Sequence, residues 1–292
     1  MNVEIINGAA HITGIAFSAE HTLFCGQTFL WHRVKPGCYA AAIRGQAMYL
    51  SVIKNGFTLW PCDESSIGFW LDYFDLHRDY DALLNPYAAH EVFGGCISAF
   101  RGLRVLNQNA WETLCTFILS ANNNEKRITS LVRALCENLG DRVESSDIAL
   151  YTFPGPNAIC RAGEEALRKM GMGYRAKYIL GSAQMVREGF DLDALMHMPY
   201  EEALKQLTRL PGVGEKVADC VLLFSLKKAQ AFPVDVWMER ALTHCFGLSG
   251  NRHSLKQQAY ALFGDEAGIL QQYLFHGARQ GLFAPYFGGE GV

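Results

Sequence analysis

Short runs of β-prone residues alternate with turn residues in the first third of the chain. The runs are FLWHRV (29–34), YAAAI (39–43), MYLSVI (48–53) and FTLW (57–60), and they are separated by KPG, RGQ and KNG. Short apolar runs bounded by Gly, Pro and Asn are typical of antiparallel strands joined by turns. We therefore expect an antiparallel β domain, which we assign to residues 1–100.

The spacing of hydrophobic residues becomes helical after about residue 65. Trp111, Leu114, Cys115, Ile118 and Leu119 follow a spacing that puts one apolar stripe on a helix. Similar spacing predicts helices at about 124–139, 175–188, 199–209, 215–226, 235–246 and 265–280. The prediction is an α+β fold in which the N-terminal antiparallel β-sheet domain is followed, in residues 101–292, by two mainly α-helical subdomains.

Composition narrows the class of protein. The chain has 292 residues, half of them apolar, and can bury a large core. No apolar stretch reaches about 18 residues and no secretory leader is evident, so we expect an intracellular, cytoplasmic protein without a membrane partner. Nine cysteines lack CxxC pairs and are expected to be reduced. A net charge of -3 argues against nonspecific coating of nucleic acid but permits a local basic face.

The segment LPGVGEKVADC (210–220) breaks one helical pattern and starts another. Its glycines permit tight turns and close approaches, so the amides of Gly212, Val213 and Gly214 can turn toward an anion such as a phosphate. The prediction is a helix-hairpin-helix motif.

Two charged residues flank this motif in an unusual way. Lys216 lies where a helix begins, although helix starts favour carboxylates. Asp235 follows Pro and Val and precedes a helical pattern, so it is a natural N-cap. By themselves, a solvated lysine and a structural cap explain both residues equally well.

The combination of LPGVGEKVADC with PVDVW resembles the helix-hairpin-helix, Gly/Pro and Asp signature of base-excision DNA glycosylases. In that superfamily the lysine marks members that join glycosylase to lyase chemistry. CGQTFLW (25–31), SANNNEKRIT (120–129) and GMGYRAKY (171–178) are similar to the 8-oxoguanine DNA glycosylase family. Relatives with an iron-sulfur cluster carry C-terminal cysteines, whereas this chain has none after Cys245. We expect no required cofactor and no iron-sulfur cluster.

The resemblance implies duplex DNA containing an oxidised purine as partner, bound by a monomer. Its reaction needs a neutral amine to attack the sugar carbon C1′ and form a Schiff base, which leads to β-elimination. A lysine with the ordinary pKa of about 10.4 is rarely neutral at pH 7, and freeing the amine costs roughly 4–5 kcal/mol. A helix start contributes only about 0.3–1 kcal/mol, so burial of Lys216 is expected to supply most of the rest. Asp235 is expected to stabilise oxocarbenium-like charge.

The resemblance also implies a pocket for the extruded base. Phe275 and Cys220 would sandwich the base, Gln271 would bond its Watson-Crick edge, and the carbonyl of Gly26 would accept the N7–H that distinguishes 8-oxoguanine from guanine. A core position is the alternative for Phe275 and Cys220, and a simple turn is the alternative for Gly26.

Further residues are assigned to DNA by resemblance. Asn122, Arg127 and Arg175 would read the orphaned cytosine, and Tyr174 would enter the stack. The carbonyls of Thr208, Leu210 and Val213 would hold a Na+ or K+ ion at the hairpin. If the resemblance is set aside, a helix cap explains the segment of Asn122 and Arg127, and a solvated helix start explains that of Tyr174 and Arg175.

One position departs from the family pattern, because Trp237 stands where eukaryotic members commonly have a phosphate-binding histidine. The sequence favours a glycosylase and lyase for 8-oxoguanine opposite cytosine. The alternatives are a monofunctional glycosylase for alkylated bases and a noncatalytic helix-hairpin-helix DNA-binding module.

Overall fold

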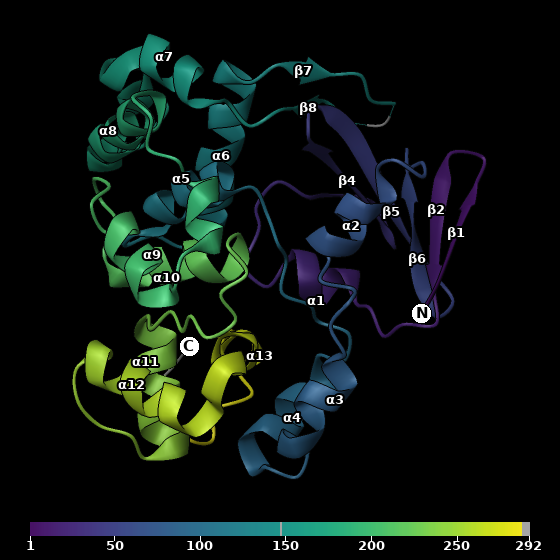
Figure 1. The fold of residues 1–292 in the computed structure, drawn as a ribbon, viewed down its shortest axis with the longest axis vertical. Coiled ribbons are helices and arrows are strands. Elements are labelled where there is room, and N and C mark those ends of the chain that lie inside the picture. The colour runs from purple at the N-terminus through teal and green to yellow at the C-terminus, as the bar shows by residue number, and fades with distance from the viewer. Residues whose placement is uncertain (147, 288–292) are drawn as a thin grey trace.

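The computed structural model describes residues 1–146 and 148–287. Within these residues, six strands form one antiparallel sheet in the order β1-β2-β6-β5-β4-β3 (Figure 1). The strands are β1 (Asn2–Ile6), β2 (Ala9–Thr13), β3 (His32–Lys35), β4 (Cys38–Ile43), β5 (Gln46–Ile53) and β6 (Gly56–Trp60). The expected meander 29–60 is therefore present, and residues 2–13 add a hairpin that the sequence analysis did not foresee.

One face of the sheet is covered by α1 (Ala19–Leu23) and α2 (Ile67–Tyr73). Phe57 of β6 is fully buried, and its ring centroid lies 5.3 Å from that of Phe74. Trp70 of α2 is also buried in this cluster, where aromatic rings supply much of the apolar area. The sheet thus has a core of its own.

The first group of helices follows the sheet and lies beside it in Figure 1. It comprises α5 (Ala110–Ser120), α6 (Glu125–Leu139), α7 (Pro156–Lys169), α8 (Ala176–Arg187), α9 (Tyr200–Leu207) and α10 (Glu215–Phe224). Short 3-10 turns, η2 (Gly173–Arg175) and η3 (Asp193–His197), and a small hairpin, β7 (Arg142–Val143) with β8 (Leu150–Tyr151), connect them. α9 and α10 form the predicted helix-hairpin-helix.

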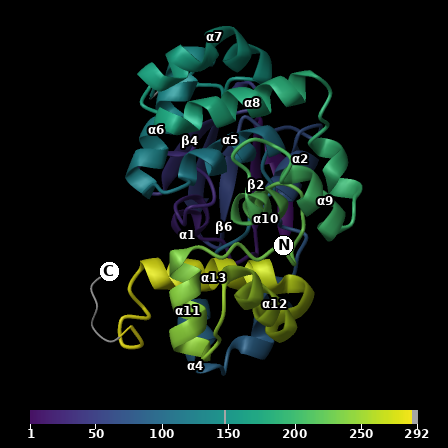
Figure 2. The same ribbon diagram turned by 90° about the vertical axis from the view of Figure 1, so that its left-hand side faces the viewer.

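The second group forms the lower layer of Figure 2. It comprises α11 (Val236–Phe246), α12 (Arg252–Phe263), η4 (Gly264–Glu266) and α13 (Ala267–Arg279), together with α3 (Tyr80–Leu84), η1 (Asn85–Tyr87) and α4 (Glu91–Ala99). α4 packs against α13, since Cys96 lies within 2.7 Å of where a β-carbon on Gly277 would be. Part of the segment 1–100 therefore packs with the C-terminal helices.

These observations confirm the predicted α+β class with an antiparallel N-terminal sheet and helical layers. The boundary at residue 100 stays a prediction. Phe93 and Phe100 belong to the core of the helical region, whereas Phe74 and Leu76 belong to that of the sheet.

A buried carboxylate ties α10 to its neighbours. Asp219 is 1% exposed, accepts a hydrogen bond of 2.6 Å from the Tyr200 hydroxyl, and lies 2.8 Å from Lys256 Nζ. Burial raises the pKa of Asp219 to about 6, although Lys256 and Tyr200 oppose the shift. The network therefore holds a carboxylate whose ionised form is disfavoured by its surroundings.

Because this pKa is raised above its value in the unfolded chain, Asp219 favours folding only while protonated, and the contribution is lost as the pH rises from about 4 through about 6. The variant Asp219→Asn keeps an acceptor for Tyr200, and Lys256 retains Glu215 at 2.7 Å. We therefore expect the free energy of unfolding of the variant, minus that of the wild type, to increase by about 2–3 kcal/mol as the pH rises from 4 to 7. Denaturant unfolding at several pH values measures this, with the exposed Asp193→Asn as matched control. A difference that stays constant with pH would contradict the assignment.

Candidate active site

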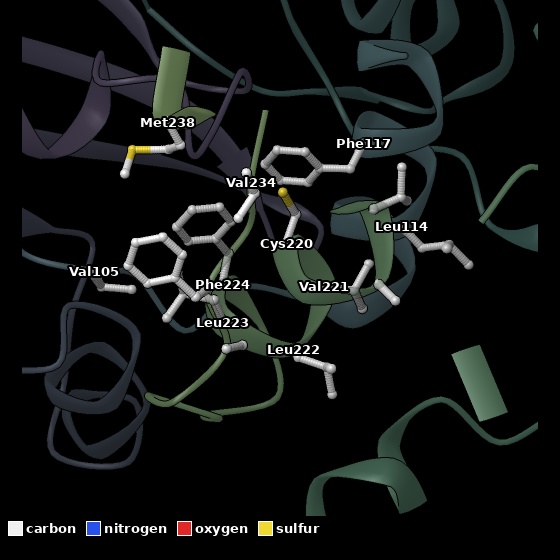
Figure 3. Packing of buried hydrophobic residues seen from close by; sticks show 14 of the residues in the cluster. Val105, Leu114, Phe117, Cys220, Val221, Leu222, Leu223, Phe224, Val234 and Met238 are labelled. Atoms are coloured by element: carbon white, nitrogen blue, oxygen red, sulfur yellow. The ribbon is translucent and has the colours of Figure 1, made fainter. Parts of the chain in front are cut away.

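α10 carries two predicted site residues on one face. Lys216 lies in its first turn and is half-buried, whereas Cys220, one turn later, is 2% exposed. The Cys220 sulfur points toward the Phe117 ring, with Phe224 and Val234 close by (Figure 3). Burial raises the pKa of Cys220 to about 12, and Lys216 opposes the shift from nearby. Cys220 is therefore a neutral thiol and forms an apolar wall.

The Lys216 amino group is held by α5. Nζ donates to Ser120 Oγ over 3.3 Å and lies 5.2 Å from the centroid of the Phe117 ring. Ser120 Oγ itself donates to the Phe117 carbonyl over 2.8 Å, so its hydroxyl hydrogen is used and it can only accept from Lys216. In the neutral amine this arrangement directs N–H toward Ser120 and leaves the lone pair free to face elsewhere.

Asp235 caps α11, as its sequence context indicated. Its Oδ1 accepts a hydrogen bond of 3.0 Å from the amide of Met238. Asp235 also lines the same small cavity as Cys220 and Lys216, and its charge contributes to the raised pKa of Cys220. Capping and a place in the site are therefore compatible.

Lys216 and Asp235 line one cavity between the two helical layers. The inner part has a volume of about 30 Å³ and is lined by Gly26, Phe117, Lys216, Cys220, Phe224, Pro233, Asp235, Gln271, Gln272 and Phe275. It opens into an outer part of about 520 Å³, which shares Gly26, Phe117, Lys216, Asp235 and Phe275. The inner part has room for water but not for a purine, so side chains at its mouth must move before a base enters.

α13 contributes Gln271 and Phe275, one turn apart. Gln271 is 3% exposed, and its Nε2 donates to the Pro233 carbonyl over 3.3 Å. Its Oε1 is buried and has no hydrogen-bond partner among the described residues. An unpaired buried acceptor is costly, so a ligand with donors on its edge would satisfy it.

The turn at Gly26 is clamped from several sides. Gln272 donates to the Cys25 carbonyl over 3.2 Å, and Gln27 donates to the carbonyls of Thr22 and Arg104 over 2.8 and 2.7 Å. Gly26 has φ +88° and lies under the Phe275 ring, where a β-carbon would be 3.3 Å from Cε1. Only glycine suits this position, because the backbone is left-handed and the space is filled.

The predicted readers of the opposite strand lie outside the inner cavity, in the loop before α6 (Asn122), in the first turn of α6 (Arg127) and in η2 (Tyr174 and Arg175). Arg175 is buried and donates to the carbonyls of Ala121 and Asn122 over 2.9 and 3.0 Å. Arg127 donates to the Gly171 carbonyl over 3.0 Å, and Tyr174 is 45% exposed. The arginines brace the loops against each other, so their predicted base contacts require these bonds to be exchanged.

The hairpin between α9 and α10 is tight. Gly212 has φ +78°, and a β-carbon there would lie 2.6 Å from Tyr178 Cγ, whereas a β-carbon on Gly214 would meet nothing within 4 Å. The Leu210 carbonyl accepts from the Val213 amide over 3.1 Å and keeps a second lone pair. Uncharged carbonyls of Thr208, Leu210 and Val213 would suit a cation of low charge.

Comparisons with known proteins agree with this geometry. Residues 11–114 match the 8-oxoguanine DNA glycosylase N-terminal domain, and residues 115–263 match the HhH-GPD superfamily of base excision DNA repair proteins. The chain belongs to the 8-oxoguanine DNA glycosylase family.

Individual relatives support the family assignment. The chain is 32% identical to the N-glycosylase/DNA lyase OGG1 of Arabidopsis thaliana over 86% of its own length and 74% of the relative's. It is 37% identical to the Saccharomyces cerevisiae N-glycosylase/DNA lyase, where the match covers 54% of this chain and 45% of the yeast protein. The Clostridium acetobutylicum 8-oxoguanine glycosylase/lyase, in complex with DNA containing cytosine opposite 8-oxoG, superposes with a TM-score of 0.92 at 27% identity, covering 97% of this chain and 99% of that one.

Sequence reasoning missed several residues of the site. Phe117 and Ser120 lie on a helix predicted only for its apolar stripe, and Gln272 was hidden beside Gln271. Arg279 continues the four-residue spacing of Gln271 and Phe275, and that spacing was a usable signal. Trp237, the departure from the family, lines the outer cavity.

The two hairpin glycines differ in a way that can be tested. Gly212→Ala would push a β-carbon into Tyr178, so we expect a loss of about 1–3 kcal/mol in stability and weaker DNA binding. Gly214→Ala has open space and ordinary φ, so its stability should fall by no more than about 0.5–1 kcal/mol, the cost of replacing Gly by Ala at the N-cap of α10. If Gly214 faces a phosphate, DNA affinity nevertheless falls. Thermal unfolding and fluorescence anisotropy separate the effects, and equal stability of the two variants would contradict the packing described.

Proposed function

We propose that the chain is a bifunctional DNA glycosylase and AP lyase that excises 8-oxoguanine opposite cytosine from duplex DNA. The observation that carries the proposal is the meeting of Lys216, Asp235 and the unpaired Gln271 Oε1 around one cavity. The family relatives named above support the same activity. Helix α10 of the helix-hairpin-helix lines the cavity, and the hairpin glycines bind the DNA backbone.

The reaction begins with extrusion of the damaged base into the cavity. Gln271 Oε1 accepts from the Watson-Crick donors of the purine, and the Gly26 carbonyl accepts its N7–H. Guanine lacks that N7–H and leaves the Gly26 carbonyl facing a lone pair, which disfavours it.

Lys216 then acts as nucleophile. The lone pair on Nζ forms a bond to C1′ as the bond between C1′ and N9 breaks. The base leaves with the bonding electrons and takes up the proton that Nζ loses. Asp235 stabilises the positive charge that develops on the sugar, and the C1′–Nζ adduct opens to a Schiff base. Removal of a proton from C2′ then expels the 3′ phosphate by β-elimination.

Other features of the proposal concern binding. The enzyme acts as a monomer inside the cell and needs no resident cofactor, while a Na+ or K+ ion at the hairpin carbonyls reinforces phosphate binding. No helix of the described residues is long and apolar enough to span a membrane.

Borohydride trapping tests the nucleophile. On a duplex with 8-oxoguanine opposite cytosine, the wild type should become covalently joined to DNA, and Lys216→Gln should not. Trapping that persists in the variant would reject Lys216. Excision of 3-methyladenine but not 8-oxoguanine, without a trapped adduct, would favour the monofunctional alternative, and binding without any cleavage would favour the noncatalytic one.

Asp235→Asn separates the charge of Asp235 from its capping role. Asn is as good an N-cap as Asp, so the free energy of unfolding should change little. Single-turnover excision of 8-oxoguanine should slow by about 100-fold or more, because the stabilising charge is lost. An excision rate equal to the wild type would leave Asp235 a cap only.

A further inference from the structure

Three residues of α13 form one row directed at the cavity. Gln271, Phe275 and Arg279 follow at four-residue intervals, and each lines the inner or the outer part. Gln271 is 3% exposed and lies deepest, whereas the Arg279 side chain is 24% exposed and lies at the mouth. Arg279 is thus the outermost member of the row that is proposed to hold the base.

Arg279 lies at the mouth of the cavity, where it lines the outer part. Its guanidinium forms an ion pair with Glu125, in the first turn of α6, and so joins the two helical layers across the mouth. The guanidinium carbon lies 5.5 Å from the centroid of the Phe275 ring. Nη1 lies 2.9 Å from where a β-carbon on Gly26 would be. Phe275 and Arg279 thus both lie against Gly26, which lines the inner and the outer part.

The position of the guanidinium indicates which part of an entering nucleotide it would meet. Lys216 and Asp235 mark the side of the sugar, whereas Gly26 and Phe275 face the base under the proposed function. The ring atom next to N7 is C8, which carries an oxygen acceptor in 8-oxoguanine and only hydrogen in guanine. A guanidinium has five donors and no acceptor, so it can bond the oxygen at C8 of 8-oxoguanine, whereas guanine offers it no acceptor at C8.

We propose that Arg279 is a lesion-recognition residue that Glu125 holds in reserve. In the DNA-free protein the ion pair covers the inner cavity, and when the base enters, Arg279 turns from Glu125 and donates a hydrogen bond to the oxygen at C8. This inference rests on the proposed function. Burial disfavours the charge of Arg279 and lowers its pKa, so the guanidinium is costly to leave without a hydrogen-bond partner. Guanine, which has no oxygen at C8, would leave it without that partner.

The test compares two substrates for each variant. One duplex carries 8-oxoguanine opposite cytosine, and the other carries an abasic site, which keeps the sugar and phosphates but has no base. In Arg279→Leu, kcat/KM for excision of 8-oxoguanine should fall about 10- to 100-fold, as expected for loss of a charged hydrogen bond, while cleavage at the abasic site stays within about 2-fold of the wild type. Equal losses on both substrates would mean a phosphate contact or a damaged fold and would overturn the proposal, as would no loss on either.

Glu125→Gln provides the second arm. Glu125 competes with the lesion for Arg279, so excision of 8-oxoguanine should be retained or increased. A loss as large as that of Arg279→Leu would show that the ion pair is only structural. Arg279→Lys keeps the charge without the planar guanidinium, so its loss in kcat/KM for 8-oxoguanine should be intermediate. If Arg279→Leu does not fold, Arg279→Lys decides the test, and full activity of this variant would contradict the proposal.

Arg168→Leu and Glu164→Gln are matched controls. They break an exposed ion pair on α7, and neither residue lines the cavity. Both should leave excision and abasic-site cleavage unchanged. A wild type that excises no 8-oxoguanine would contradict the proposed function, whereas an active wild type with an equally active Arg279→Leu variant contradicts only the inference about Arg279.

Discussion

The burial of α10 is the constraint on which the site depends. Every residue from Val217 to Phe224 is buried, so this helix has almost no freedom to rotate or slide between α5, α9 and the strand-like segment that ends at Val234. Rotation by a single residue would drive Asp219 and apolar side chains out of their contacts. The fixed helix delivers Lys216 to the rim of the cavity, where Ser120 holds its amino group.

The cavity combines apolar walls with a few polar atoms that have specific orientations. Phe117, the neutral Cys220 thiol and Phe275 form apolar walls, while Gln271 Oε1 and the Gly26 backbone remain to recognise a ligand. Such walls strengthen each polar interaction inside them, since little solvent competes. The same walls make an unpaired charge costly, so the guanidinium of Arg279 at the mouth needs a partner, which Glu125 supplies.

The elements that the sequence predicted are those that depend on local patterns, and the elements that it missed have weaker local patterns or depend on contacts between distant residues. Helical spacing located α5, α6, α8, α9, α10, α11 and α13 closely, because an amphipathic stripe is a local pattern. α4, α7 and α12 were missed: α4 and α7 contain internal glycines, and α12 has a mixed polar and apolar pattern that weakens the periodicity. The β1–β2 hairpin was missed because β1 is largely exposed and the hairpin joins the sheet only through the pairing of β2 with β6, which is distant in sequence.

The sequence by itself determined the helix-hairpin-helix, the family and the residues Lys216 and Asp235, because these depend on short motifs with strict spacing. The resemblance implied that Cys220, Gln271 and Phe275 share a pocket, but only the tertiary structure decided that Ser120 holds the lysine and that Arg279 reaches Glu125 across the mouth of the cavity. Ser120 and Lys216 are separated by 96 residues, and Glu125 and Arg279 by 154. No local pattern encodes such contacts, since they arise only when buried helix faces pack against one another.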